Sequence, residues 1–164
     1  MTLLQACQWL YDSPTGTLIR ESDLMFDLIE TAHVLGITLL AGTVAVLDLR
    51  LLGLVLKKDE VSDVAGQVLP LTLTGFAIMV VSGILLFWSE ASKMYFNPAF
   101  RIKFILMVLA GINPLIFHRT IYRTVASWDL TPSTPARAKA AAIFSLALWT
   151  GIIVSGRAIA YYHK

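Results

Sequence analysis

Long apolar runs follow one another along the chain, and polar residues are gathered between them. Each run approaches or exceeds the roughly 20 residues that an α-helix needs to cross the hydrocarbon core of a bilayer. The pattern predicts an all-α fold, an integral membrane bundle of four transmembrane helices that forms a single domain over residues 1–164. The expected spans are approximately 24–56, 67–88, 101–121 and 136–162.

The first residues form a short amphipathic segment instead of a span. Residues 3–11 mix leucines and aromatic side chains with polar ones, and the turn-forming sequence DSPTG follows at 12–16. Such a segment is typical of a helix that lies along the membrane surface. We therefore expect a short amphipathic N-terminal helix that ends in a turn.

Composition also predicts a membrane protein. Hydrophobic residues make up 57% of the chain and charged residues 15%, whereas soluble domains are about 25% charged. The mean hydropathy is +0.72. The net charge of +2 comes from Lys and Arg near the ends of the spans, where lipid headgroups are expected. The lipid bilayer is therefore the expected partner, and nucleic acid is not.

Two ionisable side chains lie near the start of the first span. Glu30 and His33 are three residues apart, and so they share one helix face. Ionisable residues inside a span are costly and indicate a functional site. The Glu-x-x-His spacing suits a di-metal bundle, but such a bundle needs two copies and this chain has one. Glu30 and His33 are therefore candidate ligands of a single metal ion, or Glu30 fixes the tautomer of His33.

Two further charged residues lie near the far end of the same span. Asp48 and Arg50 are two residues apart, about 200° around a helix, so each needs a partner of its own. Arg119 or Arg123 is the expected partner of Asp48, unless both residues only anchor the span at the headgroups. The predicted buried charge partners are Asp48, Arg50 and Lys103.

The third span contains a proline in its middle. Asn97 and Pro98 are expected to start its helix, after a loop at residues 89–100. Pro114 is expected to kink the helix, and its neighbour Asn113 needs a hydrogen-bond partner elsewhere in the bundle.

Small residues predict where helices approach one another. Gly75 and Gly83 offer close contact in the second span, and Ala147, Gly151 and Ser155 repeat every four residues in the fourth. Such a repeat suits tight packing within the bundle or a homo-oligomer. The serines in mid-helix are interpreted as packing positions or interhelical hydrogen-bond donors: Ser82, Ser145 and Ser155.

Three histidines in a small membrane bundle suggest b-type haem held by imidazoles between helices. His33 and His118 lie in parallel spans about 20 Å apart along the membrane normal, so one haem does not join them unless a helix is displaced. His163 is mismatched in depth with His33 by only about 7 Å. Arg157 is available on that side to bind a haem propionate or to pair with Asp27 or Glu30. The candidate cofactor-binding residues are His33, the first candidate for an axial ligand, His118, His163, Arg157 and Asn113.

The sequence leaves several functions open. It contains no nucleophile elbow, metalloprotease, nucleotide-binding or Rossmann motif, so enzyme activity is undecided. We expect an integral membrane cofactor-binding protein that uses haem b in electron transfer, with a redox partner or quinone. One alternative is an oligomeric carrier or channel-like protein for a small ion or metal. Another is a structural or partner-binding membrane subunit, in which the buried charges only pair with each other.

The chain resembles a family of uncharacterised bacterial four-helix integral membrane proteins along nearly its whole length. The resemblance lies in ETAHVLGITLLAG, DLRLLGL, NPAFRIKFILMVLAGINPLIFH and WTGIIVSGRAIAYY. It implies a multi-pass protein of the bacterial cytoplasmic membrane, and it names no activity. The chain is more loosely similar to membrane cytochromes of the b561 kind, which have histidine pairs at matched depth, and to copper-resistance membrane proteins. The polar positions that look like the family's signature are His33, Asp48, Arg50, Lys103, Asn113, His118 and Arg157.

Overall fold

Helices are the only regular structure in the described part of the chain, residues 2–129 and 134–162 of a computed structural model. The α-helices are α1 (Leu3–Tyr11), α2 (Pro14–Glu21), α3 (Met25–Leu51), α4 (Val61–Phe96), α5 (Pro98–Thr120) and α6 (Ala136–Ala158). Two short 3-10 helices are η1 (Tyr122–Ser127) and η2 (Ile159–Tyr161).

Within the described residues, four helical units are long and apolar enough to cross a membrane. They are α3, α4, α5 and the continuous unit of α6 with η2, of 27, 36, 23 and 26 residues. The predicted all-α bundle of four transmembrane helices is confirmed, together with a short helical segment before it. The chain is therefore built as a multi-pass membrane protein.

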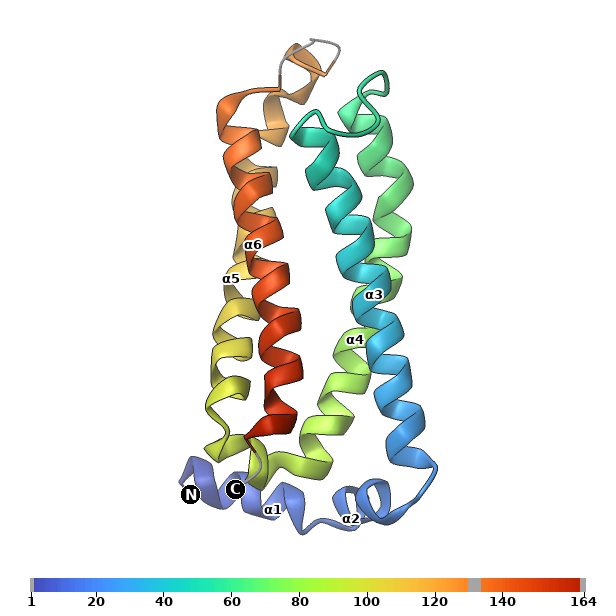
Figure 1. The fold of residues 1–164 in the computed structure, drawn as a ribbon, viewed down its shortest axis with the longest axis vertical. Coiled ribbons are helices and arrows are strands. Elements are labelled where there is room, and N and C mark those ends of the chain that lie inside the picture. The colour runs from blue at the N-terminus through green and yellow to red at the C-terminus, as the bar shows by residue number, and fades with distance from the viewer. Residues whose placement is uncertain (1, 130–133, 163–164) are drawn as a thin grey trace.

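The four long helices form two hairpins that stand side by side (Figure 1). Helix α3 packs along α4 and α5 along α6, and the hairpins meet chiefly where α6 contacts α3. Glycines let α3 and α4 approach closely. A Cβ atom at Gly75 would lie 2.7 Å from the backbone nitrogen of Leu40, and one at Gly36 would lie 2.9 Å from that of Met79. The close helix contact expected at Gly75 is thus confirmed.

The helix of the first span ends earlier than the predicted boundary at about residue 56. It ends at Leu51 because Gly53 adopts a left-handed conformation, with φ at +73°. The N–H of Leu54 donates to the carbonyl of Leu49 at 3.0 Å, and the N–H of Gly53 donates to that of Arg50 at 2.9 Å. This pair of bonds is the Schellman arrangement, in which glycine ends a helix and satisfies its last carbonyls.

Two short helices, instead of the single predicted one, precede the first span. The sequence expected as a turn starts α2, because Pro14 takes the first helical position and Ser13 caps it. The Ser13 hydroxyl accepts a hydrogen bond from the N–H of Gly16 at 3.1 Å. Both helices lie across one end of the bundle against α4 (Figure 1). There the indole of Trp88 donates to Ser13 at 2.8 Å.

The second span continues beyond its predicted end at residue 88. The loop expected at residues 89–100 is largely helical, because α4 continues to Phe96 after a kink at Glu90, where φ is −122° and ψ is 19°. Asn97 then starts α5, as predicted. Its side-chain oxygen accepts from the N–H groups of Ala99 and Phe100 at 3.0 and 3.2 Å, and Pro98 takes the first helical position.

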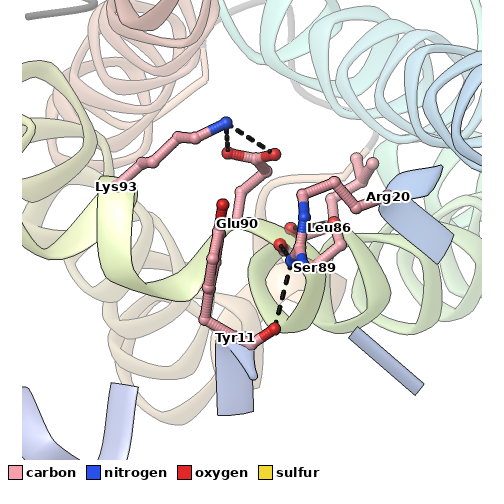
Figure 2. A network of polar contacts seen from close by, with 6 residues as sticks. All are labelled: Tyr11, Arg20, Leu86, Ser89, Glu90 and Lys93. Atoms are coloured by element: carbon pink, nitrogen blue, oxygen red, sulfur yellow. Dashed lines mark hydrogen bonds and ion pairs between the residues drawn. The ribbon is translucent and has the colours of Figure 1, made fainter. Parts of the chain in front are cut away.

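The kink in α4 is held by side chains from the N-terminal helices (Figure 2). The guanidinium of Arg20 lies 3.9 Å from the centre of the Tyr11 ring and donates to the carbonyl of Ser89 at 3.0 Å. On the other side of the kink, Lys93 and Glu90 form an ion pair at 2.7 Å. The N-terminal helices therefore pack on the bent part of α4.

Helices α5 and α6 contact each other through predicted positions. The side-chain amide of Asn113 donates to the carbonyl of Ala141 in α6 at 3.3 Å, so Asn113 has the partner that it was expected to need. Helix α5 runs unbroken past Pro114. A Cβ atom at Gly151 would lie 3.0 Å from a methyl group of Leu106, so this small residue serves packing within the chain.

An apolar cluster closes the end of the bundle opposite α1 and α2. It joins the turn between α3 and α4 to the segment between α5 and α6, and Asp129 reinforces it by accepting hydrogen bonds from the N–H and the hydroxyl of Ser62. The buried members of the cluster are Leu51, Val61, Trp128, Ala138 and Ala142.

Candidate functional site

Residues from all four spans meet in one polar region near the end of the bundle that carries α1 and α2. The hydroxyl of Ser82 in α4 lies 2.9 Å from Nδ1 of His33 in α3. Lys103 of α5 is close enough for its charge to act on the His33 imidazole, and its ammonium lies beside Gly156 of α6. We call these residues and Gly83 the His33–Lys103 centre.

The hydrogen bonds of Ser82 fix the orientation of the His33 ring. Ser82 has one hydroxyl proton, and the carbonyl of Ile78 lies 2.6 Å from its oxygen, in position to accept that proton. The hydroxyl oxygen is then the acceptor of a proton on Nδ1 of His33. The carbonyl of Met79 is a further acceptor beside the imidazole. This arrangement leaves Nε2 as the nitrogen with the free electron pair, which is the form in which histidine binds a metal.

Gly83 gives the imidazole its place against α4. A Cβ atom at Gly83 would lie 3.1 Å from Cε1 of His33 and 3.5 Å from Nδ1. The glycine therefore lets the Cε1–Nδ1 edge of the ring approach the helix that carries Ser82.

Lys103 supplies the only charge that the centre itself contains. It is partly buried and lies five residues after Pro98, the first residue of α5. Among the described residues no acceptor and no carboxylate is bonded to its ammonium. The site thus combines an imidazole ring with an ammonium group that has no hydrogen-bond or ion-pair partner among the described residues.

Comparison with known proteins places the chain in a family. The family of unknown function DUF6644 matches residues 22–162. The chain belongs to this family. The match confirms the expected membership of an uncharacterised family, and it shows no link to b561-type cytochromes or copper-resistance proteins. No curated protein and no solved structure matches the chain.

In this DUF6644 protein the match includes the whole His33–Lys103 centre and all four spans, but neither α1 nor α2. The core that the family shares is therefore the pair of hairpins, and the helices that hold the kink of α4 precede the matched region.

The other candidate cofactor residues lie away from the centre. His118 is exposed and stacks on Tyr122, with the ring centres 4.9 Å apart. It is 15 residues beyond Lys103 on the same helix, about 22 Å along its axis. Asn113 serves the contact with α6. His163 lies outside the described residues.

The candidate acidic and basic partners near His33 are not joined in the structure. Glu30 and Arg157 are both exposed. The ion pair between Lys93 and Glu90 is the only one among residues 2–129 and 134–162, so neither Glu30 nor Arg157 forms one there. Within the same residues no group of three or more His, Cys, Asp or Glu side chains is placed to hold a metal ion.

Asp48 and Arg50 are buried as predicted, but they have different partners from those expected. Arg50 donates from Nε and Nη2 to the carbonyl of Asp59, at 2.9 and 2.7 Å. Ser145 of α6 donates to the Asp48 carboxyl group, whose Oδ2 has no hydrogen-bond partner. The expected pairing of Asp48 with Arg119 or Arg123 is therefore wrong, because Asp48 faces the contact between α3 and α6.

Sequence reasoning found His33 but not the residues that complete its surroundings. Ser82 was interpreted as a packing position or hydrogen-bond donor and Gly83 as a helix contact, without a link to His33. Gly156 carried no signal, although it directly follows Ser155 of the small-residue repeat. Lys103 was predicted as a buried charge partner, because a lysine inside a span needs an anion or an interior position, but it was not linked to His33.

The bond between Ser82 and His33 leads to a prediction about the tautomer of the imidazole. Replacing Ser82 with alanine should raise the population of the other tautomer about 2- to 10-fold, since a single hydrogen bond of this kind is worth roughly 0.5–1.5 kcal/mol. Side-chain ¹⁵N NMR of histidine-labelled protein in micelles measures this population. Ser155→Ala is the matched control, because Ser155 is buried but bonds only within α6. Equal spectra for wild type and Ser82→Ala would contradict the assignment.

Proposed function

We propose that this chain binds b-type haem at the His33–Lys103 centre and transfers electrons within the membrane. The observation that supports this proposal is the orientation of His33, whose Nδ1 side is engaged by Ser82. Histidines that bind metals commonly donate their other ring N–H to a neighbouring acceptor in this way. Nε2 of His33 would then be the nitrogen that holds the haem iron.

We propose a haem with one imidazole ligand among the described residues. His33 supplies one nitrogen inside the bundle, and His118 is too far along α5 to supply a second one. Haem iron held by histidine changes between the ferric and ferrous states, and the polarity of its surroundings sets its potential. The residues around His33 keep the imidazole in one orientation and leave a cation beside it.

We place the protein in the cytoplasmic membrane of a bacterium, where a one-electron carrier between helices exchanges electrons with a quinone or a membrane-bound redox protein. The apolar spans that surround the centre suit a lipid-soluble partner.

An absorption spectrum tests the proposal directly. The full-length protein, purified in detergent after expression with ample haem, should show a Soret band, and dithionite should bring out reduced α and β bands. Their shape separates one imidazole ligand from two, because a low-spin haem with two strong ligands gives sharp bands. A flat spectrum, both as isolated and after addition of haem, would refute the proposal.

A further inference from the structure

The ammonium of Lys103 is an unpaired cation inside a membrane span. It lies about 7.5 Å along the axis from the start of α5. No hydrogen bond or ion pair joins it to any residue in 2–129 or 134–162. A charged group at such depth is costly unless it pairs with an anion or faces the interior, and such groups usually mark ligand sites.

The side chain of Lys103 faces the interior, towards α6 and α3. A Cβ atom at Gly156 would lie 3.6 Å from its Nζ and 3.8 Å from both Cδ and Cε. Because Gly156 has no side chain, no side-chain atom of this residue contacts the Lys103 ammonium. Towards α3 the charge of Lys103 is close enough to act on the His33 imidazole.

The charges around this position favour an anion. The residue after Gly156 is Arg157, a second cation at the same end of α6, and it forms no ion pair within the described residues. Glu30 is the acidic residue nearest to His33 in the sequence. It is exposed and, like Arg157, forms no ion pair within the described residues. Ammonium groups bind carboxylates through charge-assisted hydrogen bonds, which are among the stronger polar contacts in proteins.

We propose that Lys103 binds a propionate carboxylate of the haem whose axial ligand is His33. This inference rests on the proposed function and adds to it the group that orients the cofactor. Arg157, which the sequence suggested for this role, is the competing candidate, because it is exposed and adjacent to Gly156.

Two forms of the cofactor separate the roles of Lys103 and His33. Haem b and haem dimethyl ester, in which both propionates are esterified, are titrated into the purified full-length protein, and the Kd is measured from the Soret band. The variants are Lys103→Met, which keeps the length of the side chain, Lys103→Arg, which keeps its charge, and Arg157→Gln.

Wild type should bind haem about 10-fold or more tightly than the ester, as expected for a charge-assisted hydrogen bond. Lys103→Met should lose most of this preference while it binds the ester as wild type does, and that equal binding shows that the variant is folded. Lys103→Arg and Arg157→Gln should keep the preference.

Other results would overturn the inference. A preference that survives in Lys103→Met, or that disappears only in Arg157→Gln, would overturn the role of Lys103 and leave haem binding intact. If Lys103→Met does not fold, loss of the preference in Lys103→Gln supports the inference and its persistence overturns it. Wild type that binds neither compound would overturn both this inference and the proposed function.

Discussion

Replacing His33 with alanine should remove the Soret band from protein reconstituted with haem. His33 is the only described histidine in the centre, and the residues around it fix the ring that carries the proposed ligand nitrogen. Loss of a residue that only orients a metal ligand lowers affinity about 10- to 100-fold. Loss of the ligand itself should therefore weaken haem binding more than about 100-fold, as measured by titration at the Soret wavelength.

His118→Ala is the matched control for this experiment. His118 is exposed, stacks on Tyr122 and lies in the other half of α5, so its loss should leave the spectrum unchanged. A His33→Gly variant adds a second test, because imidazole added to the solution should restore part of the band. Circular dichroism confirms that each variant is helical. An unchanged Soret band in His33→Ala, or equal losses in the His33 and His118 variants, would refute His33 as the ligand.

The four spans could be predicted from sequence because a bilayer imposes a length on every apolar helix. The ends of the helices were less accurate. Gly53 ends α3 through its own backbone conformation, which apolar runs do not indicate. Glu90 lies inside a continuing helix although it is charged, because Lys93 pairs with it one turn later. The backbone conformation of Gly53 and the local contact between Glu90 and Lys93, more than hydropathy, decided these boundaries.

The polar positions of the site could be predicted singly, but not as a group. His33 and Lys103 stood out because charged and imidazole groups inside spans are rare. The proximity of His33 and Lys103 depends on the rotation of each helix about its axis and on which helices pair into hairpins. The sequence of a span that is apolar on all sides indicates neither. Asp48 shows the same limit, because charge suggested an arginine partner and the packing of α3 against α6 gave it Ser145.

The close approach of α3 and α4 leads to a prediction about stability. Gly75→Ala should lower the free energy of unfolding by about 1–3 kcal/mol, the usual cost of adding a methyl group where there is no room. The new Cβ would lie 2.7 Å from the backbone nitrogen of Leu40. Because that atom belongs to the backbone, α3 itself has to move. The midpoint of unfolding in mixed micelles measures the loss.

Gly66→Ala is the control on the same helix. A Cβ atom at Gly66 meets nothing within 4 Å, so this change should be neutral or should stabilise α4 by up to about 1 kcal/mol through helix propensity. Equal effects of the two substitutions would show that the Gly75 contact does not limit the packing of the hairpin.

The same substitution should also reach the candidate site, because the two contacts share one helix pair. Ser82 follows Gly75 by seven residues, and His33 precedes Leu40 by seven, so in these antiparallel helices the two contacts lie two turns apart. A shift of α3 at Leu40 should therefore lengthen the bond between His33 and Ser82. Gly75→Ala should then lower both the haem affinity and the free energy of unfolding. Gly66→Ala should lower neither. Full haem affinity in a destabilised Gly75→Ala protein would show that the centre is set independently of this contact.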